Sequence, residues 1–240
     1  QMSGALNLAG NVQKNMLKNK FFPRSGCTEC GYDNQCVYKD DFISFYNSKV
    51  ISSDIVVFAL ELNGRMFSSK WKTYFDRRFF YNHVPEMKGK QLGILISGKI
   101  SSYFHDFVDG LSEFQETNLS EIVTDECADS KILNKDIQQL AENSVSFANS
   151  GYIKPHTFLG VASKKIFRDD VFGKLRFIFQ ADHRYFKKHR FYDFPHTQYK
   201  KRLFILFMML ITKIPAIRKR LYSKAKDLLC APHEKVVDKY

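Results

Sequence analysis

Two short apolar runs stand out in the first half of the chain. Residues 54–60 (DIVVFAL) are compact and rich in β-branched side chains, and residues 90–97 (KQLGILIS) have the same character. Continuous apolar runs of this length are typical of strands that are buried on both faces of a parallel sheet. A weaker run at 119–124 predicts a third strand. We therefore expect 54–60 and 91–97 to be adjacent parallel strands in the middle of a sheet.

Segments with helical periodicity separate these runs, and Ser68 and Ser69 offer an N-cap to one of them. Residues 61–67, between the first strand and that helix, are expected to form a loop. Alternating strands and helices are typical of parallel crossover units, which build an open α/β sheet. The predicted helices cover residues 11–21, 42–52, 68–79, 101–117 and 129–149.

The pattern changes in the last third of the chain. Residues 164–192 and 198–229 are basic and rich in aromatic residues, and Pro195 and Pro215 interrupt their helical segments. We expect these helices to pack at least partly against the α/β part. The expected domains are an α/β domain, residues 1–163, and a basic helical extension, residues 164–240.

The net charge of +12 is concentrated at the C-terminal end. From Ala181 onward there are 15 Lys and Arg against 5 Asp and Glu, whereas the first 180 residues hold 22 against 20. This asymmetry indicates either an anionic partner (nucleic acid, a lipid surface or a cofactor phosphate) or helices with a solvated basic face. The sequence favours the solvated face.

The longest apolar run, Leu203–Ile211, lies within this basic region. It could lie in a membrane interface as an amphipathic helix, or it could be buried against the body of the protein or a second subunit. We favour burial, because a fully apolar run lacks the polar face of an interfacial helix. A homo-oligomer is thus a candidate partner, whereas a membrane surface or a nucleic acid is not expected.

Nothing in the chain predicts export or membrane insertion. No stretch approaches the roughly 20 apolar residues that a spanning helix needs, and no basic segment followed by an apolar run resembles a secretory signal. The five cysteines are odd in number, so a reduced, cytoplasmic setting is expected rather than a disulfide scaffold. Because the chain begins Gln1-Met2, we expect its natural start to be processed or to lie further upstream.

Three segments carry more specific motifs. They are GCTECGYDNQCVYKDDF at 26–42, DIVVFALELNGRMFSSKWKTYFDR at 54–77 and KGKQLGILISG at 88–98. In order and spacing they resemble flavodoxin-like NAD(P)H-dependent FMN oxidoreductases and the related iron–sulfur flavoproteins, over roughly residues 24–165. That family ends the second unit with a Lys, a Phe and an Asp-Arg pair. The residues at those positions here are Lys72, Tyr74, Asp76 and Arg77.

The resemblance implies a flavodoxin-like open parallel sheet with an FMN site at the carboxyl ends of neighbouring strands, where such sheets bind ligands. FMN would carry the redox chemistry, with NAD(P)H as the hydride donor. The alternative is an ordinary strand–helix connection that binds nothing. The implied cofactor-binding residues are Leu60, Glu61, Leu62, Asn63, Gly64, Ser97, Gly98 and Lys99.

The chain departs from this family at two places. The family has a Pro and an aromatic residue where this chain has Glu61 and Asn63, and Glu61 would place negative charge beside an electron-rich ring. No strand is found before residue 24, nor the Ser/Thr-rich loop that holds the FMN phosphate at a helix N-terminus. The first strands are thus missing: they lie in an upstream domain of a longer chain, or the module is rebuilt around fewer strands. We expect this chain alone to bind FMN weakly or not at all.

Three clustered cysteines, Cys27, Cys30 and Cys36, form the other candidate site. An iron–sulfur cluster or a tetrahedral zinc site needs a fourth ligand, for which Cys230 and His233 are candidates. The alternative, which we favour, is a set of vestigial or packed thiols.

The sequence therefore supports two functions. The first is an FMN-dependent NAD(P)H oxidoreductase or electron-transfer flavoprotein. The second is a cofactor-free flavodoxin-like interaction module that uses its basic C-terminal helices.

Overall fold

The structure is a computed structural model, and it describes residues 13–15, 21–63, 66–126, 129–192 and 199–225. The chain divides into two compact units. The first, which we name the sheet unit, contains Asp40–Asp76 and Pro85–Gly160. The second, named the helical unit, contains Phe22–Lys39, Arg77–Val84 and the chain from Val161 onward. Each unit is therefore built from stretches that are separate in the sequence. The cysteine-rich segment, which contains Cys27, Cys30 and Cys36, belongs to the helical unit.

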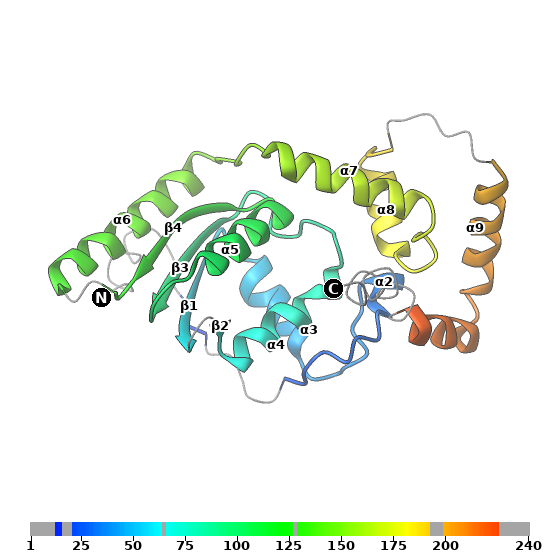
Figure 1. Cartoon of the computed structure of the whole chain (residues 1–240), viewed down its shortest axis with the longest axis horizontal. Coiled ribbons are helices and arrows are strands. Elements are labelled where there is room, and N and C mark those ends of the chain that lie inside the picture. Colours follow the sequence, from blue (N-terminus) through cyan, green and yellow to red (C-terminus); the bar gives the residue numbers. More distant parts are fainter. Residues whose placement is uncertain (1–12, 16–20, 64–65, 127–128, 193–198, 226–240) are drawn as a thin grey trace, which may run out of the picture. The chain divides into compact units, whose positions relative to one another are not determined.

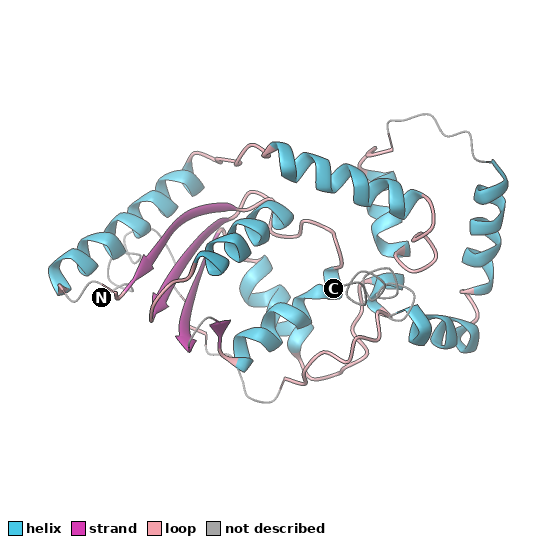
Figure 2. Ribbon diagram, viewed as in Figure 1, coloured by secondary structure: helices cyan, strands magenta, loops and turns pink. Residues whose placement is uncertain are grey.

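The sheet unit is built on an open sheet with the strand order β2-β1-β3-β4 (Figures 1 and 2). β1 pairs with β3, and β3 with β4, in parallel, whereas the short β2 pairs antiparallel with the end of β1. The prediction of two adjacent parallel strands in the middle of the sheet is confirmed, and so is the third strand. The strands are β1, Ile55–Asn63; β2, Met66–Phe67; β3, Gln91–Ser97; and β4, Asn118–Thr124.

Helices cover both faces of this sheet. On one face, Phe58 of β1 packs edge to face against Trp71 and Tyr74 of α4, with ring centroids 5.3 and 5.5 Å apart. On the other face, Gly93 lets α6 approach β3, because a Cβ there would lie 2.9 Å from the Leu140 side chain. The helices of this unit are α3, Phe42–Tyr46, continued by a π-helical turn at Asn47–Ile51; α4, Ser69–Arg77; α5, Ser102–Gln115; and α6, Ser130–Asn149.

Four of the five predicted helices are confirmed, with boundaries shifted by a few residues. A short 3-10 helix at Arg78–Tyr81 follows α4. Of the fifth, at 11–21, residues 13–15 and 21 are not helical and the others lie outside the described residues. The prediction of a loop at 61–67 is wrong, because β1 runs on to Asn63 and β2 begins at Met66. The alternation of buried Leu60, exposed Glu61 and buried Leu62 is that of a strand.

One edge of β1 is open. On one side, β1 pairs with β3 from Ile55 to Glu61. On the other, in the described parts of the chain, it pairs only with β2, through Leu62 and Asn63. An unpaired strand edge presents backbone donors and acceptors to any further strand. This edge is where an additional strand would extend the sheet.

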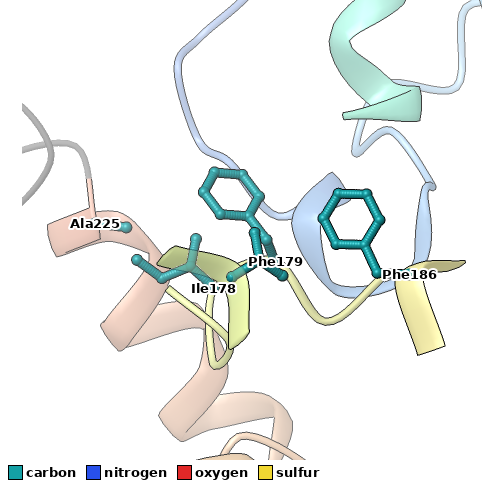
Figure 3. Close-up of a cluster of buried hydrophobic side chains, with 5 residues drawn as sticks. Ile178, Phe179, Phe186 and Ala225 are labelled. Carbon is teal, nitrogen blue, oxygen red and sulfur yellow. The ribbon is translucent and has the colours of Figure 1, made fainter. Parts of the chain in front are cut away.

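The helical unit has a core of aromatic and aliphatic side chains (Figure 3). α2 packs against α8 in this unit. Residues 215–225, after α9, are also helical. The core residues are Val171, Ile178, Phe179, Phe186 and Ala225. The labelled helices are α2, Cys30–Asp33; α7, Phe158–Phe172; α8, Gln180–Lys188; and α9, Tyr199–Ile211.

The apolar run Leu203–Ile211 forms most of α9, and the expectation that it is buried against the body of the chain is wrong. Ile205 is buried, but Leu203, Phe207 and Leu210 are 72%, 58% and 60% exposed. Burial by a second subunit remains a prediction. Among the described residues, no helix is long and apolar enough to cross a membrane.

Candidate functional site

The parallel strands bring the predicted flavin-site residues to the carboxyl ends of β1 and β3. Glu61 and Ser97 are directly opposite each other in the β1–β3 pairing. The side chains of Leu60 and Leu62 point into the core and are buried, whereas Glu61, Ser97 and Lys99 are exposed. Gly64 and the side chain of Asn63 lie outside the described part of the chain.

The turn after β3 is held by two carboxylates that follow β4. The Ser97 hydroxyl and the Gly98 N–H donate to the two carboxylate oxygens of Asp125, at 2.6 and 2.8 Å. The Ile100 N–H donates to the Glu126 carboxylate at 2.5 Å. The resemblance implies that a flavin site would offer backbone N–H groups of this region to the carbonyl oxygens of the ring. In this chain its own acidic side chains occupy them.

The same hydrogen bonds lower the pKa of Asp125 below its usual value of 3.8, the Ser97 hydroxyl contributing most and the Gly98 N–H next. The carboxylate therefore stays ionised at neutral pH. Asp125 is also fixed through its backbone, because its N–H donates to the Ile96 carbonyl of β3 at 3.1 Å. The two carboxylate contacts and the backbone bond together tie the end of β4 to the turn after β3.

Gly98 brings the turn against the end of β1. Its φ is +112°, a backbone conformation that side-chain-bearing residues rarely adopt. A Cβ at this position would lie 2.8 Å from the Leu62 carbonyl oxygen. The turn is thus packed onto the backbone of β1, at the place where the resemblance implies a flavin ring.

Sequence reasoning missed Asp125 and Glu126. Both stand directly after β4, the strand with the weakest hydrophobic pattern. Because the carboxyl ends of parallel strands meet at one edge of a sheet, acids that follow the third strand were candidates for the same site as Ser97. That position in the sequence was the signal available.

The cysteines are not assembled into a metal site in the described residues, where no group of three or more His, Cys, Asp or Glu side chains could hold a metal. Cys30 donates its thiol proton to the Phe79 carbonyl and to Asn82 Oδ1, each at 3.7 Å. Burial raises the pKa of this thiol to about 12, so it is a neutral thiol rather than a thiolate ligand. Cys27 and Cys36 are free and partly exposed. The candidate fourth ligands, Cys230 and His233, lie outside the described residues.

Asn82 fixes the cysteine-rich segment in the helical unit. This residue is almost fully buried and has a φ of +54°. Its amide nitrogen donates to the Cys30 carbonyl at 2.8 Å and to Asn34 Oδ1 at 2.7 Å. These contacts support the interpretation of Cys30 as a packed structural thiol.

A buried Asp–His pair lies in the same unit and was also missed. Asp182 is fully buried, and its carboxylate oxygens lie 2.7 Å from His83 Nδ1 and 3.2 Å from the His83 backbone nitrogen. The His83 ring packs on the Phe167 ring, with centroids 3.7 Å apart. Because a buried carboxylate needs compensating hydrogen bonds, His83 satisfies Asp182 and links residues 99 positions apart in the sequence.

Asp76 and Arg77, which match the family's Asp-Arg pair in the sequence, have different partners in the structure, and Asp76 pairs locally. Its carboxylate lies 2.5 Å from Lys72 Nζ, one helical turn earlier in α4. Arg77 is buried instead, and donates to the Phe22 carbonyl at 2.8 Å with its guanidinium above the Tyr38 ring. Both residues thus have structural contacts.

Comparison with known proteins gave no match, either to a protein-family model or to a curated protein sequence.

Proposed function

We propose that the sheet unit is a flavodoxin-like module that does not bind FMN tightly by itself, and that the chain acts as an interaction protein through its basic helices. One observation carries the first half of this proposal. The Gly98 and Ile100 N–H groups already donate to the carboxylates of Asp125 and Glu126. A flavin would have to displace both carboxylates before it could use these donors.

The charge at the strand ends also disfavours FMN binding. Glu61, Asp125 and Glu126 are all exposed near the ends of β1 and β4. Three carboxylates disfavour an anionic ligand such as FMN or a reduced flavin, although salt screens exposed charges. The phosphate-binding loop that would offset this repulsion is not found in the sequence.

The second candidate is the FMN-dependent NAD(P)H oxidoreductase. The observation that favours it is the topology, since β1, β3 and β4 end at one edge of an open parallel sheet, the usual ligand-binding edge. In that case FMN would carry the hydride and the chain would position the ring.

An ultraviolet–visible spectrum and a titration with FMN separate the two functions. We expect the purified chain to show neither the two visible bands of a flavin nor the broad shoulder of an iron–sulfur cluster. Added FMN should bind weakly or not at all. The double substitution Asp125→Asn and Glu126→Gln should strengthen FMN binding, because it removes two charges and weakens the competing acceptors.

The matched control is Asp106→Asn with Asp109→Asn, which removes two exposed acids from α5 and should leave FMN binding unchanged. A chain that purifies yellow with stoichiometric FMN would refute the proposal and favour the oxidoreductase.

A further inference from the structure

α9 presents an apolar stripe to solvent. Leu203, Leu206, Phe207 and Leu210 follow the i, i+3, i+4, i+7 spacing of a single helical face. Isolated exposed apolar residues are normal on a protein surface, but a contiguous group marks an interaction site. The exposed apolar residues of this region are Leu203, Phe204, Leu206, Phe207, Leu210, Ile214 and Ile217, between 37% and 72% exposed.

The opposite side of this region is attached to the helical unit. Thr212 is buried and accepts a hydrogen bond from Gln180 Nε2 at 2.8 Å. The Tyr222 hydroxyl lies 2.8 and 2.7 Å from the carbonyl oxygens of Phe177 and Ile178. Together with buried Ile205, these contacts fix which side faces inward, so the apolar stripe is the outward side of a docked helix.

Positive charges flank the stripe along the chain. Residues 199–225 contain eight Lys and Arg and no Asp or Glu. Of these eight residues, Arg218 is half-buried, with its guanidinium over the Tyr32 ring, and the other seven are exposed. The exposed cations are Lys200, Lys201, Arg202, Lys213, Lys219, Arg220 and Lys224.

We propose that this surface, α9 with residues 212–225, docks on an anionic lipid bilayer. The apolar stripe would enter the boundary between headgroups and acyl chains, and the flanking cations would contact anionic headgroups. Helices with an apolar face and Lys and Arg at its borders bind membranes in this way, and each cation near an anionic surface adds to the attraction. The thirteen residues of α9 measure about 20 Å, which is too short to cross a bilayer, so α9 would lie in the plane of the interface.

The apolar stripe and the flanking cations together favour a lipid bilayer over other partners. Nucleic acid would use the cations but gives no role to exposed Leu203 and Leu210. A second copy of this chain would cover the stripe but would bring the same positive charges together, which is unfavourable. The inference names the partner of the interaction module and so rests on the proposed function. The two fail separately, because FMN titration tests the strand ends and vesicle binding tests α9.

Flotation of the full chain with lipid vesicles tests the proposal. We expect binding to vesicles of phosphatidylcholine mixed with phosphatidylserine, weaker binding to phosphatidylcholine alone, and a steep loss of binding as salt rises. The double substitution Phe207→Gln and Leu210→Gln should lower the partition coefficient about a hundredfold, since each side chain loses most of its apolar transfer. Lys200→Glu with Lys201→Glu should lower it at least about tenfold.

Two matched controls make the same kinds of substitution at exposed positions outside α9. Phe158→Gln with Leu159→Gln alters an apolar pair that is 86% and 74% exposed at the start of α7, and should leave binding unchanged. Lys131→Glu with Lys135→Glu makes the same charge change on α6 of the sheet unit, and should lower vesicle binding only slightly.

Absence of binding by the native chain to phosphatidylserine vesicles at low salt would overturn the proposal. Equal losses in the α9 variants and their controls would also overturn it. Sedimentation of the native chain as a dimer that Phe207→Gln and Leu210→Gln dissociate, with no vesicle binding, would assign the stripe to a second copy instead.

Discussion

The strand ends of the sheet unit and the outer side of α9 differ in whether their surface groups already have partners within the described chain. At the strand ends, the donors that a ligand would need are already used, since Ser97, Gly98 and Ile100 all donate to Asp125 or Glu126. On α9, apolar side chains remain exposed to water. A group that already has its hydrogen bond gains little from a new partner, whereas exposed apolar surface gains about 25 cal/mol per Å² when it is covered.

The two regions also differ in charge. Carboxylates gather at the strand ends, whereas the segment 199–225, which contains α9, holds eight cations and no acid. The same anionic ligand would therefore be repelled by the first region and attracted by the second. Fold resemblance alone would direct attention to the strand ends, where open α/β sheets bind ligands, but the chemistry of the surface points to the helices.

The largest expected effect compares two phenylalanines, one from each unit. Phe58 of β1 is 5% exposed and Phe207 of α9 is 58% exposed. Phe58→Ala should lower the free energy of unfolding by about 3–5 kcal/mol, because it leaves a cavity among Trp71, Tyr74 and Phe75. Phe207→Ala should change it by less than about 0.5 kcal/mol.

Chemical denaturation followed by circular dichroism measures both. A loss of several kcal/mol in Phe207→Ala would contradict the comparison, because it would mean that the α9 stripe is part of the folded core in solution.

The sheet could be predicted from the sequence because its strands are short apolar runs with few alternative structures. Residues 54–60 and 91–97 pair as expected, since continuous apolar runs of this length are typical of strands in a parallel sheet. The loop predicted at 61–67 failed for a local reason. The prediction places Glu61 in the loop, although an outward-pointing charged residue is compatible with a strand that continues to Asn63.

The site and the helical surface were harder to predict. The hydrogen bonds of Asp125 and Glu126 depend on how three strands end relative to one another, which no local pattern contains. The burial expected for Leu203–Ile211 failed because a continuous apolar run does not show which side of its helix faces the protein. That side is chosen by contacts from distant residues, such as Gln180 to Thr212 and Tyr222 to Ile178.

A smaller effect is expected where the cysteine-rich segment packs in the helical unit. A Cβ at Gly31 would overlap the Ile178 carbonyl oxygen, the same oxygen that lies 2.7 Å from the Tyr222 hydroxyl. Gly31→Ala should therefore lower the free energy of unfolding by about 1–3 kcal/mol. In the matched control, a Cβ at Gly110 of α5 meets nothing within 4 Å, so Gly110→Ala should raise it by about 0.5–1 kcal/mol.

Thermal or urea unfolding of the two variants gives both values. If Gly31→Ala were as stable as the native chain, the docking of α2 on the backbone of Ile178 would be wrong. The inward contacts that leave the α9 stripe exposed would then lose part of their support.

The smallest effect concerns the hydrogen bonds at the strand ends. The Ser97 hydroxyl is the largest cause of the lowered pKa of Asp125, ahead of the Gly98 N–H. Ser97→Ala should therefore raise the pKa of Asp125 toward 3.8 without returning it fully, because the Gly98 N–H still donates to the carboxylate. The pKa can be measured from the pH dependence of the Asp125 carboxyl chemical shift in NMR spectra, with Ser102→Ala as an exposed control nearby.

The sign of the effect on stability follows from the direction of this shift. A carboxyl group whose pKa is lower in the folded than in the unfolded chain stabilises the fold above the unfolded pKa, and this contribution is lost as the pH falls through the folded pKa. Ser97→Ala should therefore reduce the amount of unfolding free energy that is lost as the pH falls through the Asp125 pKa. The circular dichroism spectrum at neutral pH should stay unchanged. An Asp125 pKa that is the same in both proteins would mean that the Ser97 hydroxyl does not donate to the carboxylate in solution. The Ser97 hydroxyl would then be available to a ligand, and the contrast between the strand ends and α9 would rest on the Gly98 and Ile100 N–H groups alone.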